Sequence, residues 1–268
     1  MLVGILGDLG RDSYLPDVLD GVASYQLAHG RAFDLLLQVG DVSNGAHSLE
    51  FDATEMAEAR RRHEGTLPLP IHFVRGNHDA LSKLQALAAG TAPIPVESPG
   101  VLAWVMDGTV LDLGGVRVGF TGGADVHADR CLDPASLDRL RAQRPIDVLV
   151  SHDGPVGLSK PRPDGTPVGD PYIGAFVQEP AGPALVVFGH YHVSAGPRPL
   201  GRTTIVILAP AIRPPADGSL GVLDCRARKF WVAGREEGAV SMGIEGDRLS
   251  ARPAAARNWP LLAAVTRQ

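Results

Sequence analysis

The sequence predicts an α/β fold, and three observations support this prediction. Apolar, strand-like runs alternate with amphipathic helical patterns from residue 2 to residue 89, which favours parallel strands joined by right-handed crossovers. Later in the chain, turn signals separate short apolar runs, which indicates antiparallel strands. Five of the apolar runs end in a polar residue, and most of these residues follow a glycine. The third observation bears on function as well as on fold.

The predicted elements can be given in chain order. Strands are expected at 2–8, 33–41 and 70–79, and helices at 12–29, 49–65 and 80–89. The segment 101–123 is expected to form antiparallel strands because it contains the turn signals Asp107-Gly108 and Gly114-Gly115. A helix at 134–143 then precedes strands at 147–152, 184–190, 203–211, 219–225 and 229–234. We expect one domain over 1–234 and a weakly patterned C-terminal extension over 235–268, packed on the same domain.

The composition excludes several classes of protein. The formal net charge is −5, so the chain has no broad basic surface for extended duplex nucleic acid. It contains only two cysteines, which is too few for a disulfide framework and indicates a reducing compartment. No stretch is long and apolar enough to span a membrane, and the chain opens on a strand-like run rather than a signal peptide. We therefore expect a cytoplasmic protein without a membrane partner.

The polar residues at the ends of the predicted strands have the chemistry of metal ligands. They are Asp8, Asp41, Asn77, His152, His190 and His192. In an open α/β sheet, sites form beyond the carboxyl ends of the strands, so we expect these side chains to converge on one crevice. The glycines before several of them allow tight turns and leave room for a ligand. Carboxylate, amide and imidazole donors together favour manganese, iron, zinc or cobalt over calcium or a thiolate-bound metal.

The charge of such a centre favours an anionic substrate. Two divalent ions held against Asp8 and Asp41 leave a net positive charge of about two units. This local charge would attract a phosphate ester although the chain as a whole is acidic.

The same residues resemble the motifs of the calcineurin-like metallophosphoesterase superfamily, in the family's order. The motifs are Asp8, Gly40-Asp41, Gly76-Asn77-His78-Asp79, His152 and Gly189-His190-Tyr191-His192. The resemblance spans residues 1 to 192 and extends to the strands that follow. It implies a four-layer α/β/β/α sandwich of two mixed β-sheets flanked by helices, with a dinuclear metal centre. It also implies that Asp41 bridges the two ions, that Asn77, His152 and His190 complete one site, and that Asp8 and His192 belong to the other.

The sequence departs from the family pattern in two places. The first motif is usually Asp-x-His, whereas this chain has Asp8-Leu9-Gly10. One metal site therefore has fewer protein ligands, and a water is expected in place of the imidazole, with His47 and Tyr14 as alternatives. Many members have an Asp where this chain has Asn44, and protein Ser/Thr phosphatases have an Arg where it has Gly45. The second departure argues against a protein phosphatase.

Taken with the donor chemistry, the resemblance implies a phosphoric ester hydrolase with two divalent metal ions, manganese being the first choice. Hydroxide shared by the two ions is expected to attack phosphorus, with His78 as general acid toward the leaving oxygen. Asp79 is expected to orient His78 or, alternatively, to cap the helix at 80–89. Substrate contacts are expected from four residues, the last two of which lie on a long loop at 153–173. These residues are Asn44, His127, Lys160 and Arg162.

The leading functional hypothesis is a phosphodiesterase that acts on small or nucleotide-like substrates. Two alternatives belong to other classes: a phosphomonoesterase, and a non-catalytic binding scaffold with a weakened metal site. The presence of His78 and of the other expected ligands favours an enzyme over a scaffold.

Overall fold

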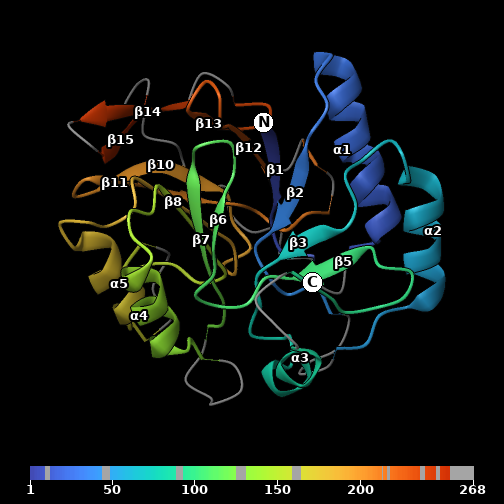
Figure 1. The fold of residues 1–268 in the computed structure, drawn as a ribbon, viewed down its shortest axis with the longest axis horizontal. Coiled ribbons are helices and arrows are strands. Elements are labelled where there is room, and N and C mark those ends of the chain that lie inside the picture. Colours follow the sequence, from blue (N-terminus) through green and yellow to red (C-terminus); the bar gives the residue numbers. More distant parts are fainter. Residues whose placement is uncertain are drawn as a thin grey trace.

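Two mixed β-sheets lie face to face at the centre of the structure, and helices cover the outer face of each sheet (Figure 1). The computed structural model describes residues 1–9, 13–43, 49–88, 93–124, 131–158, 164–212, 214–215, 218–235, 239–245 and 248–253. This arrangement confirms the four-layer α/β/β/α sandwich expected from the sequence.

The larger sheet contains nine described strands in the order β15-β14-β13-β12-β1-β2-β3-β5-β4. Their bounds are β1 Leu2–Leu6, β2 Leu35–Gln38, β3 Ile71–Phe73, β4 Ile94–Pro95, β5 Leu102–Trp104, β12 Leu220–Asp224, β13 Lys229–Val232, β14 Val240–Glu245 and β15 Arg248–Pro253. Strands β1, β2, β3 and β5 run parallel, and β12 pairs antiparallel with the other side of β1. Within the expected C-terminal extension, β14 pairs with β13 and continues this sheet.

The smaller sheet contains six described strands in the order β10-β11-β9-β8-β7-β6. Their bounds are β6 Val110–Asp112, β7 Arg117–Thr121, β8 Val148–Ser151, β9 Leu185–Phe188, β10 Ala195–Leu200 and β11 Thr203–Ile207. Four of these strands run parallel, and the two at the edges, β6 and β10, are antiparallel to their neighbours.

One expectation about strand pairing was wrong. The segment 101–123 does not form one antiparallel unit, because β5 pairs in parallel with β3 in the larger sheet. Only β6 and β7 form the expected antiparallel hairpin, in the smaller sheet. The chain therefore crosses between the two sheets after β5, at the Asp107-Gly108 turn signal, where Gly108 has a φ of +87°.

The described helices are α1 Leu15–His29, α2 Ala53–His63, α3 Leu81–Leu87, α4 Pro134–Ala142 and α5 Pro171–Gln178. Helices α1 and α2 lie on one side of the sandwich, and α4 and α5 lie on the other (Figure 1). Asp133 and Asp170 cap α4 and α5 by accepting hydrogen bonds from backbone N–H groups of the first turn. A proline follows each cap, which suits the first turn of a helix because proline has no N–H to satisfy. None of the described helices is long and apolar enough to cross a membrane.

Three apolar layers hold the sandwich together, one for each interface between its four layers. The central strands are buried on both faces, so their side chains alternate between two of these layers. In β1, Leu2 and Leu6 belong to the layer under α1 and α2, whereas Val3 and Ile5 belong to the layer between the sheets. The third layer packs the smaller sheet against α4 and α5. The two sheets are thus fixed against each other, and so are the ends of their strands.

Candidate metal centre

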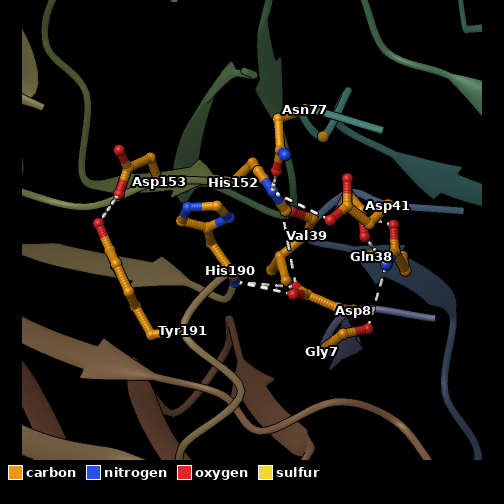
Figure 2. A network of polar contacts seen from close by, with 12 residues as sticks. Gly7, Asp8, Gln38, Val39, Asp41, Asn77, His152, Asp153, His190 and Tyr191 are labelled. Carbon is orange, nitrogen blue, oxygen red and sulfur yellow. Dashed lines mark hydrogen bonds and ion pairs between the residues drawn. The ribbon is translucent and has the colours of Figure 1, made fainter. Parts of the chain in front are cut away.

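The polar residues predicted as ligands gather where parallel strands of both sheets end (Figure 2). Asp8, Asp41 and Asn77 follow β1, β2 and β3 of the larger sheet, while His152 and His190 follow β8 and β9 of the smaller one. The site therefore lies between the sheets, and each sheet contributes part of it. The ends of the parallel strands bring these side chains close together, as expected for an open α/β sheet.

The tightest group of donors surrounds His152. One ligand atom from each of Asp41, His152 and His190 lies within 4.8 Å of the others. The Nε2 atom of His152 lies 2.9 Å from Asn77 Oδ1 and 3.4 Å from Asp41 Oδ2. His152 is fully buried, and Asp41 and Asn77 are nearly so.

The backbone fixes which nitrogen of His152 faces this group. Its Nδ1 atom lies 2.8 Å from the carbonyl oxygen of Val39, and a carbonyl can only accept, so Nδ1 carries the proton. In its neutral form the ring presents a lone pair at Nε2 to the Asn77 and Asp41 oxygens, and this is the form that could hold a cation. Three lone-pair donors that face one another in a buried place fit a cation.

A second group of donors surrounds Asp8. The backbone N–H of His190 donates to both carboxylate oxygens of Asp8, at 3.1 and 2.9 Å. The Nε2 atom of His192 lies 3.7 Å from Asp8 Oδ2. Asp8 is buried, whereas the side chain of His192 is 61% exposed, so this half of the site opens to solvent.

Burial shifts the protonation equilibria of the site. It raises the pKa of Asp8 to about 7, and the neighbouring Asp41 carboxylate adds to the rise while His152 opposes it. Burial, followed by the nearby His152 ring, lowers the pKa of His190 to about 3. For His152, burial favours the neutral ring, but the carboxylates of Asp41 and Asp8 outweigh it and raise the pKa. Bringing these groups together is thus costly, and a divalent cation would offset the cost.

The backbone is also strained at three candidate ligands. Asp41, His190 and His192 have φ angles of 59°, 66° and 51°, in the left-handed region that non-glycine residues avoid. Among the described residues, only Arg228 joins them as a non-glycine residue with positive φ. Such conformations cost on the order of 1–3 kcal/mol each and persist where the surrounding contacts impose them, commonly at functional sites.

Two glycines leave the space that the carboxylates occupy. A Cβ atom at Gly189 would lie 2.0 Å from Asp8 Oδ1, and one at Gly76 would lie 2.0 Å from Asp41 Oδ1. Any side chain at either position would displace the carboxylate. The glycines of the glycine–histidine motif and of the Asn-His-Asp motif are therefore packing requirements of the site.

Asp79 makes backbone contacts that the sequence did not predict. Its carboxylate accepts hydrogen bonds from the backbone N–H groups of Gly76, Asp41, Val42 and Ser43, at 2.7, 2.9, 3.1 and 3.1 Å. It therefore joins the loop after β2 to the loop after β3. The N-cap of α3 is Ala80, so Asp79 does not cap that helix. The residue positions the backbone that carries Asp41 and Asn77, and its expected role in orienting His78 stays a prediction.

Sequence reasoning missed two other contacts that hold the site. The buried Gln38 amide donates to the carbonyl oxygens of Gly7 and Gly40, at 3.1 and 2.5 Å, and links the ends of β1 and β2. In the sequence, this role of Gln38 was indicated only by a polar residue at the end of an otherwise apolar strand. The hydroxyl of Tyr191 donates to Asp153, whose pKa burial raises to about 6, and ties the loop after β9 to the loop after β8 (Figure 2).

The remaining predicted residues fall into two groups. The side chain of His78 is exposed at the rim of the site, and its backbone N–H donates to Asp41 Oδ1 at 2.9 Å. Tyr14 was an alternative ligand, but its hydroxyl donates to Glu58 Oε2 at 2.5 Å on the surface, so that alternative was wrong. Several predicted residues lie outside the described part of the chain, namely Gly10, Asn44, Gly45, His47, His127, Lys160 and Arg162.

A two-sheet sandwich with carboxylate, amide and imidazole donors at the ends of its strands defines the class of metal-dependent phosphoesterases. The family model for calcineurin-like phosphoesterases matches residues 1–194, and the chain belongs to this family. A comparison with curated proteins gives no match.

Solved structures share the fold at low sequence identity. The crystal structure of TT1561 from Thermus thermophilus is 17% identical, with a TM-score of 0.53 over 86% of this chain and 98% of that one. A Staphylococcus aureus protein assigned as a 5′-nucleotidase, in complex with alpha-ketoglutarate, is 13% identical. Its TM-score is 0.50, over 100% of this chain and 55% of that one. GAP50, the anchor in the inner membrane complex of Plasmodium, is 11% identical. Its TM-score is 0.50, over 94% of this chain and 89% of that one.

The first prediction concerns Gly189. Gly189→Ala should weaken Mn²⁺ binding by at least about tenfold, because the new Cβ would lie 2.0 Å from Asp8 Oδ1 and 2.6 Å from Val39 Cγ2, so that both side chains must move. Circular dichroism checks that the variant is folded. Isothermal titration calorimetry measures the affinity. The matched control is Gly174→Ala in α5, where the nearest atom to a new Cβ is 3.8 Å away. This control should keep the wild-type affinity. Equal affinities for Gly189→Ala and wild type would contradict the packing requirement.

The second prediction concerns the loops that Asp79 joins. Asp79→Ala should lower the free energy of unfolding of the metal-free protein by about 3 kcal/mol or more, because four backbone N–H groups lose their acceptor. Asp52→Ala removes a cap that accepts two N–H groups on an exposed helix end, and should cost about 1 kcal/mol. Urea unfolding measures both. A smaller loss for Asp79→Ala than for Asp52→Ala would exclude the joining role.

Proposed function

We propose that this protein hydrolyses phosphate esters with two divalent metal ions, and that its substrates are small or nucleotide-like phosphodiesters. The observation that carries the proposal is the convergence of His152 Nε2, Asn77 Oδ1 and Asp41 Oδ2 in a buried place, next to a second carboxylate on Asp8. Donors of this kind suit manganese first, and iron, zinc or cobalt as alternatives.

The donors divide into two sets that share Asp41. Asn77, His152 and His190 would hold one ion with it, in the buried half of the site. Asp8 and His192 would hold the other ion with it, in the half that opens to solvent. When bound, the two ions supply positive charge to the phosphoryl oxygens and make water acidic enough to serve as a nucleophile near neutral pH.

The protein's own groups then orient the substrate and move a proton. The backbone N–H of His78 donates to Asp41, which holds the residue beside the metal centre, and its side chain is exposed to solvent. A protonated ring there can give its proton to the leaving oxygen. His152 cannot take this role, because it is fully buried and its Nδ1 proton is held by the Val39 carbonyl.

One motif position argues against a protein phosphatase. Gly45 stands where protein Ser/Thr phosphatases of the family have an arginine. Two divalent ions against Asp8 and Asp41 leave about two positive charges, which attract a phosphate monoester as well as a diester. The preference for a diester is therefore tested by the relative rates on the two kinds of substrate. A cytoplasmic location stays a prediction.

The third prediction tests the metal centre. Asp41→Ala should reduce Mn²⁺-dependent hydrolysis of bis(p-nitrophenyl) phosphate by more than about 100-fold, because both ions lose a shared ligand. Asp138→Ala is the control, since this exposed residue on α4 pairs only with Arg141 among the described residues. It should leave the rate unchanged. Near-normal hydrolysis by Asp41→Ala would rule out the two-ion centre. If the wild type hydrolyses p-nitrophenyl phosphate faster than the diester, the result would favour a phosphomonoesterase. If it hydrolyses neither substrate, the result would favour a non-catalytic scaffold.

The fourth prediction tests the proton donor. His78→Ala should slow hydrolysis about 10²- to 10⁴-fold for diesters with an alkoxide leaving group, and only a few-fold for those with p-nitrophenolate. The difference arises because p-nitrophenolate leaves without needing a proton. Steady-state rates on the two substrates, measured at saturating Mn²⁺, give the comparison. Equal losses on both would remove His78 from proton transfer.

A further inference from the structure

The two histidines in the buried half of the candidate metal centre are held in different ways. The imidazole of His152 is fixed by a hydrogen bond, since its Nδ1 lies 2.8 Å from the carbonyl oxygen of Val39. A metal-ligating imidazole usually has such a second contact, which sets the orientation of its ring. The backbone N–H of His190 donates to Asp8, but the ring of His190 makes no hydrogen bond within the described part of the chain. The orientation of this ring therefore depends on packing.

Contacts with two other rings take the place of that hydrogen bond at His190 (Figure 2). The centroid of its imidazole lies 4.9 Å from that of the Tyr191 ring and 4.9 Å from that of the His152 ring, at interplanar angles of 69° and 60°. Both contacts are edge-to-face, a geometry that aromatic rings favour. Because His152 is itself fixed, the position of the His190 ring depends on where the Tyr191 ring lies.

Two further contacts hold the Tyr191 ring in place. Its hydroxyl donates to Asp153 Oδ1, across the gap between the loop after β9 and the loop after β8. Its ring packs edge-to-face on Phe188, with the centroids 6.1 Å apart and an interplanar angle of 86°. The hydroxyl contact is the polar one of the two, and it sets the direction in which the ring points.

Asp153 is a fixed anchor for this hydroxyl. It is only 6% exposed, its Oδ1 also accepts from the backbone N–H of Gly154 at 2.7 Å, and its carbonyl oxygen accepts from the Ser151 hydroxyl at 2.7 Å. A Cβ atom at Gly154 would lie 2.2 Å from the Phe188 ring, so the backbone after Asp153 is in close contact with that ring. The acceptor is therefore held by the backbone and by the core of the smaller sheet.

We propose that Tyr191 is a positioning residue of the candidate metal centre, whose hydroxyl, bound to Asp153, fixes the imidazole of His190 beside that of His152. Asp153 directly follows His152, and Tyr191 directly follows His190, so one hydrogen bond joins the two segments that carry these ligands. The inference rests on the proposed function and adds to it a residue that acts through His190. Loss of the hydroxyl leaves the imidazole free to turn, which lowers the affinity for the ion that His190 would hold.

The experiment compares Tyr191→Phe, which removes only the hydroxyl, with Tyr191→Ala, which also removes the ring. Isothermal titration calorimetry measures Mn²⁺ affinity, and circular dichroism checks that both variants are folded. Tyr191→Phe should weaken Mn²⁺ binding at least about fivefold, the effect expected for the loss of one hydrogen bond. Tyr191→Ala should weaken it further, because the edge-to-face contact with His190 is lost as well.

A spectroscopic readout separates positioning from a general loss of stability. Co²⁺ is one of the candidate metals, and its visible absorption reports how the ligands are arranged around the ion. Tyr191→Phe should shift the position or the intensity of these bands in the Co²⁺-loaded protein, because the imidazole of His190 changes its orientation. A variant that unfolds at a lower temperature but keeps the wild-type bands and the wild-type Mn²⁺ affinity would overturn the inference.

A double-mutant cycle tests whether Asp153 is the anchor. If the hydroxyl of Tyr191 acts through this carboxylate, Tyr191→Phe combined with Asp153→Ala should bind Mn²⁺ no more weakly than the weaker of the two single variants. Losses that multiply in the double variant would show two independent effects and would overturn the anchoring role.

The matched control is Tyr25→Phe, which also removes a tyrosine hydroxyl from a hydrogen bond. The Tyr25 hydroxyl accepts from the indole of Trp231 at 3.0 Å, in the apolar layer under α1 and α2. This variant should keep the wild-type Mn²⁺ affinity and the wild-type Co²⁺ bands. An equal loss of affinity in Tyr25→Phe and Tyr191→Phe would show that the effect is not specific to the metal centre, and would also overturn the inference.

Failure of this inference and failure of the proposed function give different results. Hydrolysis of bis(p-nitrophenyl) phosphate by the wild type, with equal Mn²⁺ affinities for wild type and Tyr191→Phe, would overturn the positioning role alone. Weaker Mn²⁺ binding by Tyr191→Phe, in a protein that hydrolyses neither this diester nor p-nitrophenyl phosphate, would support the positioning role and overturn the proposed function. A wild-type protein that binds none of the four candidate metals would overturn both.

Discussion

Four backbone N–H groups from two separate loops converge on the buried carboxylate of Asp79, and this contact sets where the candidate ligands lie. Asp41 and Asn77 come from different strands, and neither strand alone determines the distance between them. Gln38 performs the corresponding task for the ends of β1 and β2, and the pair of Tyr191 and Asp153 does so in the smaller sheet. The ligands are thus held by a surrounding set of polar contacts rather than by their own packing.

Several features of the candidate metal centre are energetically unfavourable, and a bound metal ion would offset them. The Asp8 carboxylate is buried beside that of Asp41, and burial lowers the pKa of His190 while nearby carboxylates raise that of His152. Three candidate ligands also adopt left-handed backbone conformations. None of these features improves the stability of a protein without a ligand. The apolar layers on both sides of each sheet supply the stability that tolerates them. The stability of the sandwich therefore allows the unfavourable conformations and contacts of the metal centre to persist.

Much of the fold could be predicted because its central strands are short, apolar and closed by glycine and a polar residue. The pattern placed β1, β2, β3, β8 and β9, and with them every candidate ligand that the structure describes. Strand pairing was less predictable: β5 looks like part of a hairpin, but its partner β3 is set by packing between distant segments. Helix α5 and strand β10 were also missed, since α5 is short and β10 contains two prolines. The role of Asp79 was hidden because hydrogen bonds to backbone groups leave no residue pattern in sequence.

The position of β1 in the larger sheet has a consequence for how the protein is made. Val3 pairs with Leu35 on one side and with Leu223 on the other, so the strand that precedes Asp8 is enclosed by segments from both ends of the chain. During synthesis, β1 can pair with β2 early, but its second edge stays open until β12 leaves the ribosome. An open strand edge is a template for pairing with other chains, and contacts of such sequence separation form slowly. The nascent protein therefore carries an apolar strand with one open edge through most of its translation, and the strand that precedes Asp8 is paired on both edges only after β12 has been made.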